Sequence, residues 1–166
     1  MDADDHTTRE GLFNTAEAYR VSATVLGQHP AKVGHDDKPV QFLYSHAIEL
    51  FLKALLRQKY GVKTIRKQFG HNIKKLVAEA ETLGLVVTCE DRDVLAVMED
   101  TNVLLEMRYI RTGPKTSLET VEPKKLCRTT LNVRDRVADA LLCKGDLLER
   151  RVGEARQLGP APTTSA

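Results

Sequence analysis

Residues 40–60 read VQFLYSHAIELFLKALLRQKY, and this stretch decides the fold. Wound as a helix, it is apolar over almost its whole surface, through Phe42, Leu43, Ala47, Ile48, Leu50, Phe51, Leu52, Ala54, Leu55 and Leu56. Four polar residues recur every three or four positions and so share one helical face: His46, Glu49, Lys53 and Arg57. A helix that is apolar nearly all round needs neighbours on several sides. We therefore predict that 40–60 is the central helix of a bundle.

The composition agrees with an all-α protein. The chain has 166 residues, of which 42% are hydrophobic, 29% charged and only 5% aromatic, a balance that favours helices. We predict one domain over 7–156, an antiparallel up-and-down bundle of about five helices, between a flexible N-terminus (1–6) and a disordered tail (157–166). The longest apolar run is too short to span a bilayer, and the acidic start MDADD differs from a basic leader. We expect a cytoplasmic protein without a membrane partner.

Capping residues and glycines divide the chain into helical segments. Thr7 and Glu10 fit a capping box that opens a first helix ending at Gly27. The central helix stops at Gly61, and the basic stretch 62–69 is a connection with at most a turn of helix. The remaining helices are expected to begin at Asn72 or His71, at Asp91 and at Pro123, with Gly84 ending the first of these and Leu126, Val133, Val137, Leu141 and Leu148 lining the last.

Cysteines and histidines show no ligand spacing. Cys89, Cys127 and Cys143 are far apart in the sequence, so we expect them to be buried as small apolar residues. A loop over 27–39 carries acidic and imidazole side chains without helical spacing, which argues against a metal site. The chain also lacks a Gly-rich phosphate loop. We therefore expect neither a metal nor a cofactor.

Charge is distributed unevenly along the chain although the net charge is only +2. The stretch 53–75 carries eight Lys and Arg residues and no acid, whereas 79–106 carries eight acids and only Arg92 as a cation. Two interpretations remain open. The basic stretch forms an edge that meets phosphate, or the two zones face each other, within one chain or across a dimer.

The order of three motifs resembles the HEPN superfamily. The motifs are HAIELFLKALL at 46–56, GHNIKKL at 70–76, and Arg108-Tyr109, and the resemblance covers about 8–109. It implies a four- or five-helix bundle, often dimeric, with roles in RNA cleavage, toxin–antitoxin and phage-defence systems, or nucleotide binding. A cognate antitoxin of the nucleotidyltransferase type is the partner that such a context implies.

The chain departs from the nuclease pattern of that superfamily. Its ribonucleases carry an Arg followed by a His four to six residues later, but Gly113, Pro114 and Lys115 stand at those distances from Arg108, and the last histidine of the chain is His71. Cleavage of RNA without a metal needs proton transfer, for which an Arg is a poor shuttle. The usual active site is therefore absent, and we do not expect an enzyme.

Several residues are candidates for a site. Glu49 and Lys53 pair at the edge of the bundle, or Glu49 instead holds the guanidinium of Arg108. His71 and Asn72 cap a helix, or they contact phosphate with Arg66 and Lys67 behind them. Arg108, Tyr109 and Arg111 balance a helix dipole, or bind a nucleotide on which Tyr109 stacks.

Three hypotheses of function follow. The first is a non-catalytic HEPN-like module, expected to be a homodimer, that binds RNA, a nucleotide or a partner protein. The second is a divergent, metal-independent endoribonuclease or toxin that uses Arg108 with His46 or His71, the only imidazoles in the motifs. The third is a structural domain for protein–protein interaction. Salt dependence separates the first from the third, because phosphate binding weakens steeply as salt rises.

Overall fold

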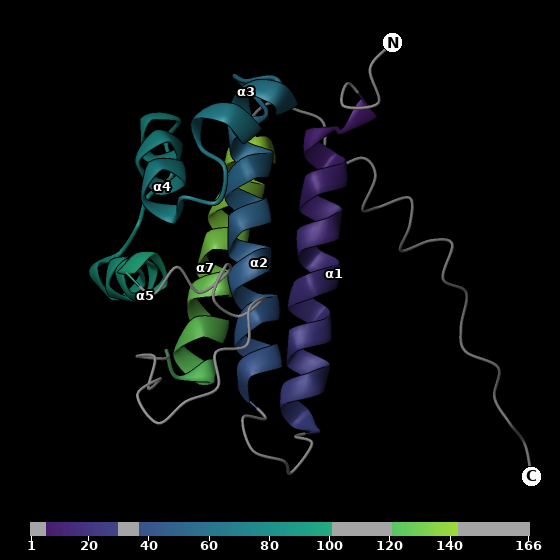
Figure 1. Cartoon of the computed structure of the whole chain (residues 1–166), viewed down its shortest axis with the longest axis vertical. Helices are drawn as coiled ribbons and strands as arrows, with labels where there is room; N and C mark the ends of the chain where they lie inside the picture. The colour runs from purple at the N-terminus through teal and green to yellow at the C-terminus, as the bar shows by residue number, and fades with distance from the viewer. Residues whose placement is uncertain (1–5, 30–36, 101–120, 143–166) are drawn as a thin grey trace, which may run out of the picture.

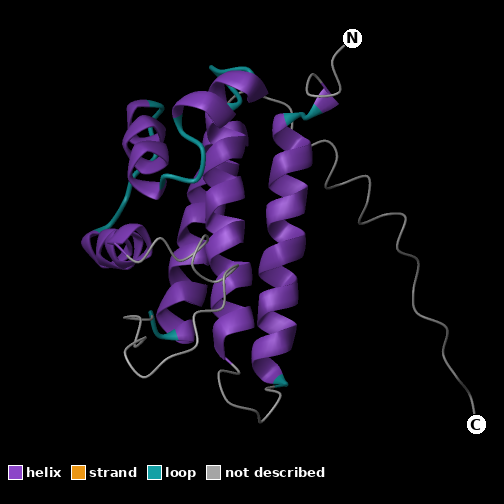
Figure 2. Cartoon of the chain, in the orientation of Figure 1, coloured by secondary structure: helices purple, strands orange, loops and turns teal. Residues whose placement is uncertain are grey.

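A computed structural model describes residues 6–29, 37–100 and 121–142, except for the side chain of Asp100. Every regular element in these ranges is a helix and none is a strand (Figure 2). The helices are α1 (Arg9–Gln28), α2 (Asp37–Leu56), α3 (Val62–Gln68), α4 (Ile73–Thr82), α5 (Cys89–Asp100) and α7 (Pro123–Leu142). The all-α prediction is confirmed for this part of the chain, and none of its helices has the length and hydrophobicity needed to cross a bilayer.

Three long helices, α1, α2 and α7, lie side by side, with α4 and α5 next to them (Figure 1). α1 and α2 run in opposite directions, as an up-and-down bundle requires. α7, however, runs in the same direction as α2. Gln58, just after α2, donates a hydrogen bond to the carbonyl of Ala140 near the end of α7, at 3.5 Å. α1 and α2 are thus antiparallel, whereas α2 and α7 are parallel.

α2 is the centre of the core, as predicted. Of its 20 residues 12 are buried, against three in α1 and seven in α7, helices of the same length. The ring of Phe51 is fully buried and meets that of Phe13 from α1 edge-on, with ring centroids 5.0 Å apart. The predicted bounds of this helix, 40–60, were wrong at both ends, and the helix begins at Asp37. The helix stops at Leu56, and the guanidinium of Arg57 holds the following turn by donating to the carbonyls of Thr7 and Tyr60.

The helix caps confirm one prediction and correct another. Asn72 caps α4 as predicted, because its side chain accepts from the backbone N–H of Lys75 at 2.8 Å. The cap of α1 is Thr8 rather than Thr7, and its hydroxyl accepts from the backbone N–H of Gly11 at 2.9 Å. Thr7 has Glu10 three residues later, as a capping box requires, whereas Thr8 has Gly11 there, so the sequence pattern selected the wrong one of two adjacent threonines. The basic stretch after α2 forms the separate helix α3, which is more than the predicted turn.

α5 and α7 are joined by a buried carboxylate, that of Asp91. Its side chain is 1% exposed and accepts from hydroxyl, amide and guanidinium donors of Thr88, Thr129, Asn132 and Arg136, at 2.6–3.3 Å. Burial by itself would raise the pKa of Asp91, but these hydrogen bonds outweigh burial and lower it. Asp91 therefore enters the folded structure as an anion that fastens two helices together.

The cysteine prediction is wrong for Cys89. This residue is the first of α5 and is exposed, since the first turn of that helix buries Asp91 instead. Cys127 on α7 is half-buried, and Cys143 lies outside the described residues. Neither described cysteine is in a disulfide.

Candidate functional site

A buried carboxylate on α2 receives two donors from different parts of the chain. Glu49 is 1% exposed, and its Oε1 accepts both from Nζ of Lys53, one helical turn later, and from Nδ1 of His71, at 2.9 Å. The predicted pairing of Glu49 with Lys53 is confirmed. It lies in the interior of the bundle rather than at its edge, because the side chains of Lys53 and Glu49 are only 15% and 1% exposed.

His71 reaches Glu49 from the connection between α3 and α4. Gly70 precedes it with φ +54°, a backbone conformation that favours glycine, and Asn72 follows as the cap of α4. An ionised carboxylate only accepts hydrogen bonds, so Nδ1 of His71 carries the proton and Nε2 is the nitrogen left for other contacts. The His71 side chain is 42% exposed and lines a hollow of about 350 Å³ with Phe69, Asn72, Ile73, Met98 and Glu99.

The other oxygen of Glu49 has unused hydrogen-bonding capacity. Oε2 is buried, and no residue in the described ranges donates to it. Arg108, the alternative partner that the sequence suggests for Glu49, lies outside those ranges, as do Tyr109 and Arg111. The pairing of Glu49 with Arg108 therefore stays a prediction, and a free acceptor is available for it.

His46, the second candidate imidazole, has different surroundings from His71. It is half-buried on α2, where its ring meets Tyr19 of α1 edge-on at 4.5 Å and stacks on Phe42 at 5.8 Å between centroids. These ring contacts place His46 against α1, whereas Glu49 and Lys53 meet the loop before α4. Of the residues predicted for the site, the structure brings together Glu49, Lys53, His71 and Asn72.

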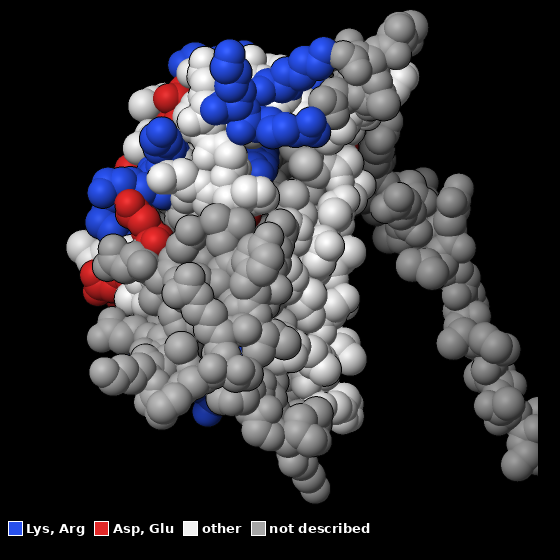
Figure 3. Space-filling view, in the orientation of Figure 1, with Lys and Arg blue, Asp and Glu red and all other residues white. Residues whose placement is uncertain are grey.

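Exposed cations lie on α3 and on the first turn of α4, and Figure 3 shows a blue cluster over α3 at one end of the molecule. We call this surface the basic corner, which consists of Lys63, Arg66, Lys67, Lys74 and Lys75. No acid occurs between the first and last of these residues. Lys67 and Lys75 have no acidic partner among the described residues. The basic corner includes Arg66 and Lys67, which the sequence analysis placed behind His71.

The basic and acidic zones of the sequence meet only in part. Lys59 pairs with Glu79 at 2.9 Å, and Lys74 pairs with Glu99 at 3.4 Å. The hydrogen bond from Lys59, followed by that from Tyr60, lowers the pKa of Glu79. Arg92 pairs with Glu81, which is a contact inside the acidic zone. The interpretation that the two zones face each other is therefore confirmed for these two pairs, and the interpretation that a basic edge meets phosphate stays a prediction.

Two features were missed from the sequence. The hydrogen bond between Glu49 and His71 joins residues that the motifs contain but that no local spacing connects. From the sequence, Asp91 was interpreted only as part of a helix start. Its spacing from Thr88, which is typical of a capping box, was the one signal that its carboxylate accepts hydrogen bonds. Asp91 also lines a second hollow, of about 600 Å³, between α5 and α7, where Glu90, Asp93, Lys125 and Arg128 mix both signs of charge.

The described residues include no group of three or more His, Cys, Asp or Glu side chains placed to hold a metal ion. Comparisons of the chain with protein-family models, with curated proteins and with solved structures found no match. The chemistry of the site therefore rests on its own geometry.

Proposed function

We propose that this protein is a non-catalytic, HEPN-like module that binds RNA through the basic corner. The observation that carries this proposal is the group of five exposed cations on 63–75, a stretch of the sequence that contains no acid; Figure 3 shows the blue cluster over α3. Proteins hold the phosphate backbone of nucleic acids mainly through such Lys and Arg side chains.

The spread of the charges favours a polymer over a single nucleotide. The cations extend over α3 and the first turn of α4, whereas the hollow beside His71 is lined by apolar, amide and imidazole groups and the carboxylate of Glu99. A single phosphate in that hollow would meet few cations, but a backbone crossing the corner would meet several. The exposed ring of His71 offers a face on which a base of single-stranded RNA can stack.

The test is a salt titration of the binding of a fluorescent single-stranded RNA, followed by anisotropy. The variant Lys67→Ala with Lys75→Ala removes two cations that have no acidic partner in the described structure. Since each contact to single-stranded RNA contributes a slope of about −0.7 to log K against log salt, the slope should shrink by about 1.4. The matched control is Lys124→Ala with Lys125→Ala, two exposed lysines at the start of α7. Equal slopes for both variants, or no binding by the wild type at low salt, would refute the proposal.

A second candidate function, a divergent metal-independent ribonuclease, is favoured by the hydrogen bond between Glu49 and His71. A carboxylate that accepts from Nδ1 orients an imidazole and leaves Nε2 for proton transfer. In that function, His71 takes the proton of an RNA 2′-hydroxyl as this oxygen attacks the phosphorus, and returns it to the departing 5′-oxygen. Arg108 stabilises the charge on the phosphate.

RNA digestion in the presence of a chelator tests this second candidate. We expect wild-type activity to be lost in His71→Gln and in Arg108→Ala, while RNA binding by the basic corner persists. If all three proteins cleave equally, or none does, the ribonuclease hypothesis fails and the binding proposal is unaffected.

A further inference from the structure

The hollow beside His71 has the composition of a ligand site. It measures about 350 Å³ and lies where the loop before α4 meets the last turn of α5. It is lined by three apolar and three polar side chains, those of Phe69, Ile73, Met98, His71, Asn72 and Glu99. Ligand pockets are mostly apolar, carry a few polar groups and measure about 300–1,000 Å³. The hollow lies at the lower end of that range, which suits one small ring system.

Local structure holds the walls of the hollow in place. Ile73 and Met98 belong to the hydrophobic core, at 4% and 2% exposure, and Phe69 packs against that core. Gly70, with φ +54°, allows a tight turn in which the backbone N–H of Asn72 donates to the carbonyl of Phe69 at 3.0 Å. Because these walls are already fixed, a ligand that enters the hollow orders little of the protein.

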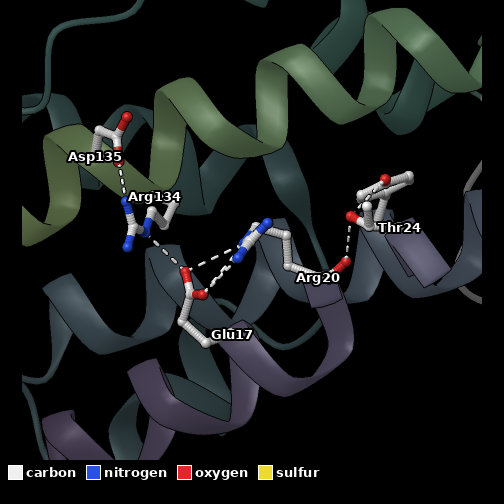
Figure 4. Close-up of polar contacts among 6 residues, drawn as sticks. Glu17, Arg20, Thr24, Arg134 and Asp135 are labelled. Atoms are coloured by element: carbon white, nitrogen blue, oxygen red, sulfur yellow. Dashed lines mark hydrogen bonds and ion pairs between the residues drawn. The ribbon is translucent and has the colours of Figure 1, made fainter. Parts of the chain in front are cut away.

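Two other polar clusters of the described ranges are satisfied within the protein. Glu17 of α1 accepts from Arg20 at 2.9 Å and from Arg134 of α7 at 2.8 Å, and all three side chains are about four-fifths buried (Figure 4). The buried carboxylate of Asp91 likewise accepts from four neighbouring side chains. These clusters join helices to one another and leave little for a ligand to bind.

The polar groups of the hollow, by contrast, keep hydrogen-bonding capacity for a ligand. Oδ1 of Asn72 accepts from the backbone N–H of Lys75, which leaves the NH₂ group of this amide as a donor. The carboxylate of Glu99 only accepts, and it pairs with Lys74 at 3.4 Å, where the lysine side chain is 73% exposed. A pair so open to solvent is weak, so Glu99 can accept from a ligand. The hollow thus offers a carboxylate and an amide donor above apolar walls.

Among the bases of RNA, guanine matches this set of groups. Its Watson–Crick edge carries two adjacent donors, N1–H and the N2 amine, beside the acceptor O6, and a carboxylate can accept from both donors at once. Adenine and cytosine place an acceptor next to their amine, and uracil has a single N–H between two carbonyls. A carboxylate that faces any of these three edges meets the lone pairs of an acceptor and is repelled. A carboxylate in a base-sized hollow therefore selects guanine.

We propose that the hollow holds one guanine base of the bound RNA and that Glu99 selects this base. The inference rests on the proposed function, because the basic corner has to hold the strand whose base enters the hollow. The two surfaces adjoin, since Lys74 and Lys75 of the basic corner directly follow Ile73 of the hollow. In the complex, Glu99 accepts from N1–H and from the N2 amine, the amide of Asn72 donates to O6, and the apolar walls cover the ring of the base.

Fluorescence anisotropy of the full chain with single-stranded RNAs tests the selection of guanine. The probes are strands of about ten uridines that differ in one central base, G or A. The wild type should bind the G strand about 5- to 150-fold more tightly, which is the discrimination that a bidentate contact to a base provides. In Glu99→Gln this ratio should fall close to one, because the amide turns an NH₂ group toward a donor of guanine. Glu90→Gln is the matched control, since it removes the same charge from α5 at a side chain that is 82% exposed.

Analogues of guanine test which edge of the base is recognised, and circular dichroism establishes that both variants fold. A strand with 7-deazaguanine keeps the Watson–Crick edge and should bind like the G strand, whereas inosine lacks the N2 amine and should bind with intermediate affinity. Equal affinity of the wild type for the G and A strands, with the salt dependence of the basic corner intact, would refute the guanine site alone. A wild type that binds neither strand at low salt would refute the proposed function together with this inference. Equal ratios in Glu99→Gln and Glu90→Gln would overturn the role of Glu99.

Discussion

Replacing Lys53 with methionine tests whether the cluster around Glu49 behaves as a buried ion pair. The Lys53 side chain is 15% exposed and the Glu49 side chain 1% exposed. Lys53→Met leaves the carboxylate buried with His71 as its remaining donor among the described residues. Breaking a buried pair by removing one partner costs about 3–5 kcal/mol, because the other charge is left uncompensated. We expect a loss of this size in the free energy of unfolding.

Removing both charges should restore most of that stability. In Glu49→Leu with Lys53→Met, neither charge of this pair remains, and the apolar side chains add to the core that already surrounds α2. Such double replacements are often neutral or stabilising, so we expect the double variant to lie within about 1 kcal/mol of the wild type. The strong coupling between the two positions is the signature of burial.

The assay is equilibrium unfolding in urea at pH 7, followed by circular dichroism at the helical minimum. The control is Lys59→Met, which breaks the pair between Lys59 and Glu79, where the lysine side chain is 52% exposed. That pair lies in solvent, and we expect no measurable loss from it. A loss below about 1 kcal/mol for Lys53→Met, or a double variant no better than the single one, would refute the assignment of Glu49 to the interior.

Three further predictions concern single residues. Asp91 has a lowered folded pKa, so its contribution to stability is present above its unfolded pKa of about 3.9 and is lost as the pH falls below that value. In urea titrations between pH 6 and pH 2, Asp91→Asn should therefore lose less stability on acidification than the wild type, and parallel curves would contradict this. Thr8→Ala should cost about 1 kcal/mol by removing the cap of α1, whereas Thr7→Ala should cost much less, and equal losses would restore Thr7 as the cap. Gly84→Ala should cost about 1 kcal/mol or more in thermal unfolding, because residue 84 has φ +99°. Gly61→Ala should be close to neutral, because residue 61 has φ −68° and open space around it. A larger loss for Gly61→Ala than for Gly84→Ala would refute the backbone argument.

The core could be predicted because its signal is local. The apolar surface of 40–60 identified the central helix, and Asn72 and Pro123 marked the starts of α4 and α7, as the structure confirms. Periodicity reports which face of a helix is buried, since burial follows from residue type and spacing alone. Periodicity does not report whether two helices that are far apart in the sequence run in the same or in opposite directions, and so the parallel packing of α2 and α7 was not foreseen.

The polar site could be predicted only as a set of candidates. Glu49, Lys53 and His71 were named from the sequence, with Lys53 or Arg108 as the alternative partners of Glu49. The pair with Lys53 is confirmed, but the hydrogen bond to His71 was not foreseen. The choice of partner for a buried carboxylate depends on tertiary geometry, which a single sequence does not encode at any fixed spacing. Asp91 was missed for the same reason, since three of its donors lie on α7, about 40 residues later.

The position of α7 in the chain has a consequence for synthesis on the ribosome. α2 is complete once residue 56 has been made, but α7, which covers part of its apolar surface, begins only at Pro123. At about 5–20 residues per second, several seconds separate the two events. During that time α1 and then α4 cover part of α2, and the surface of α2 that α7 will cover is exposed to chaperones and to other nascent chains. A slow codon between residues 57 and 122 would lengthen this interval and raise the risk of aggregation without changing one residue of the folded protein.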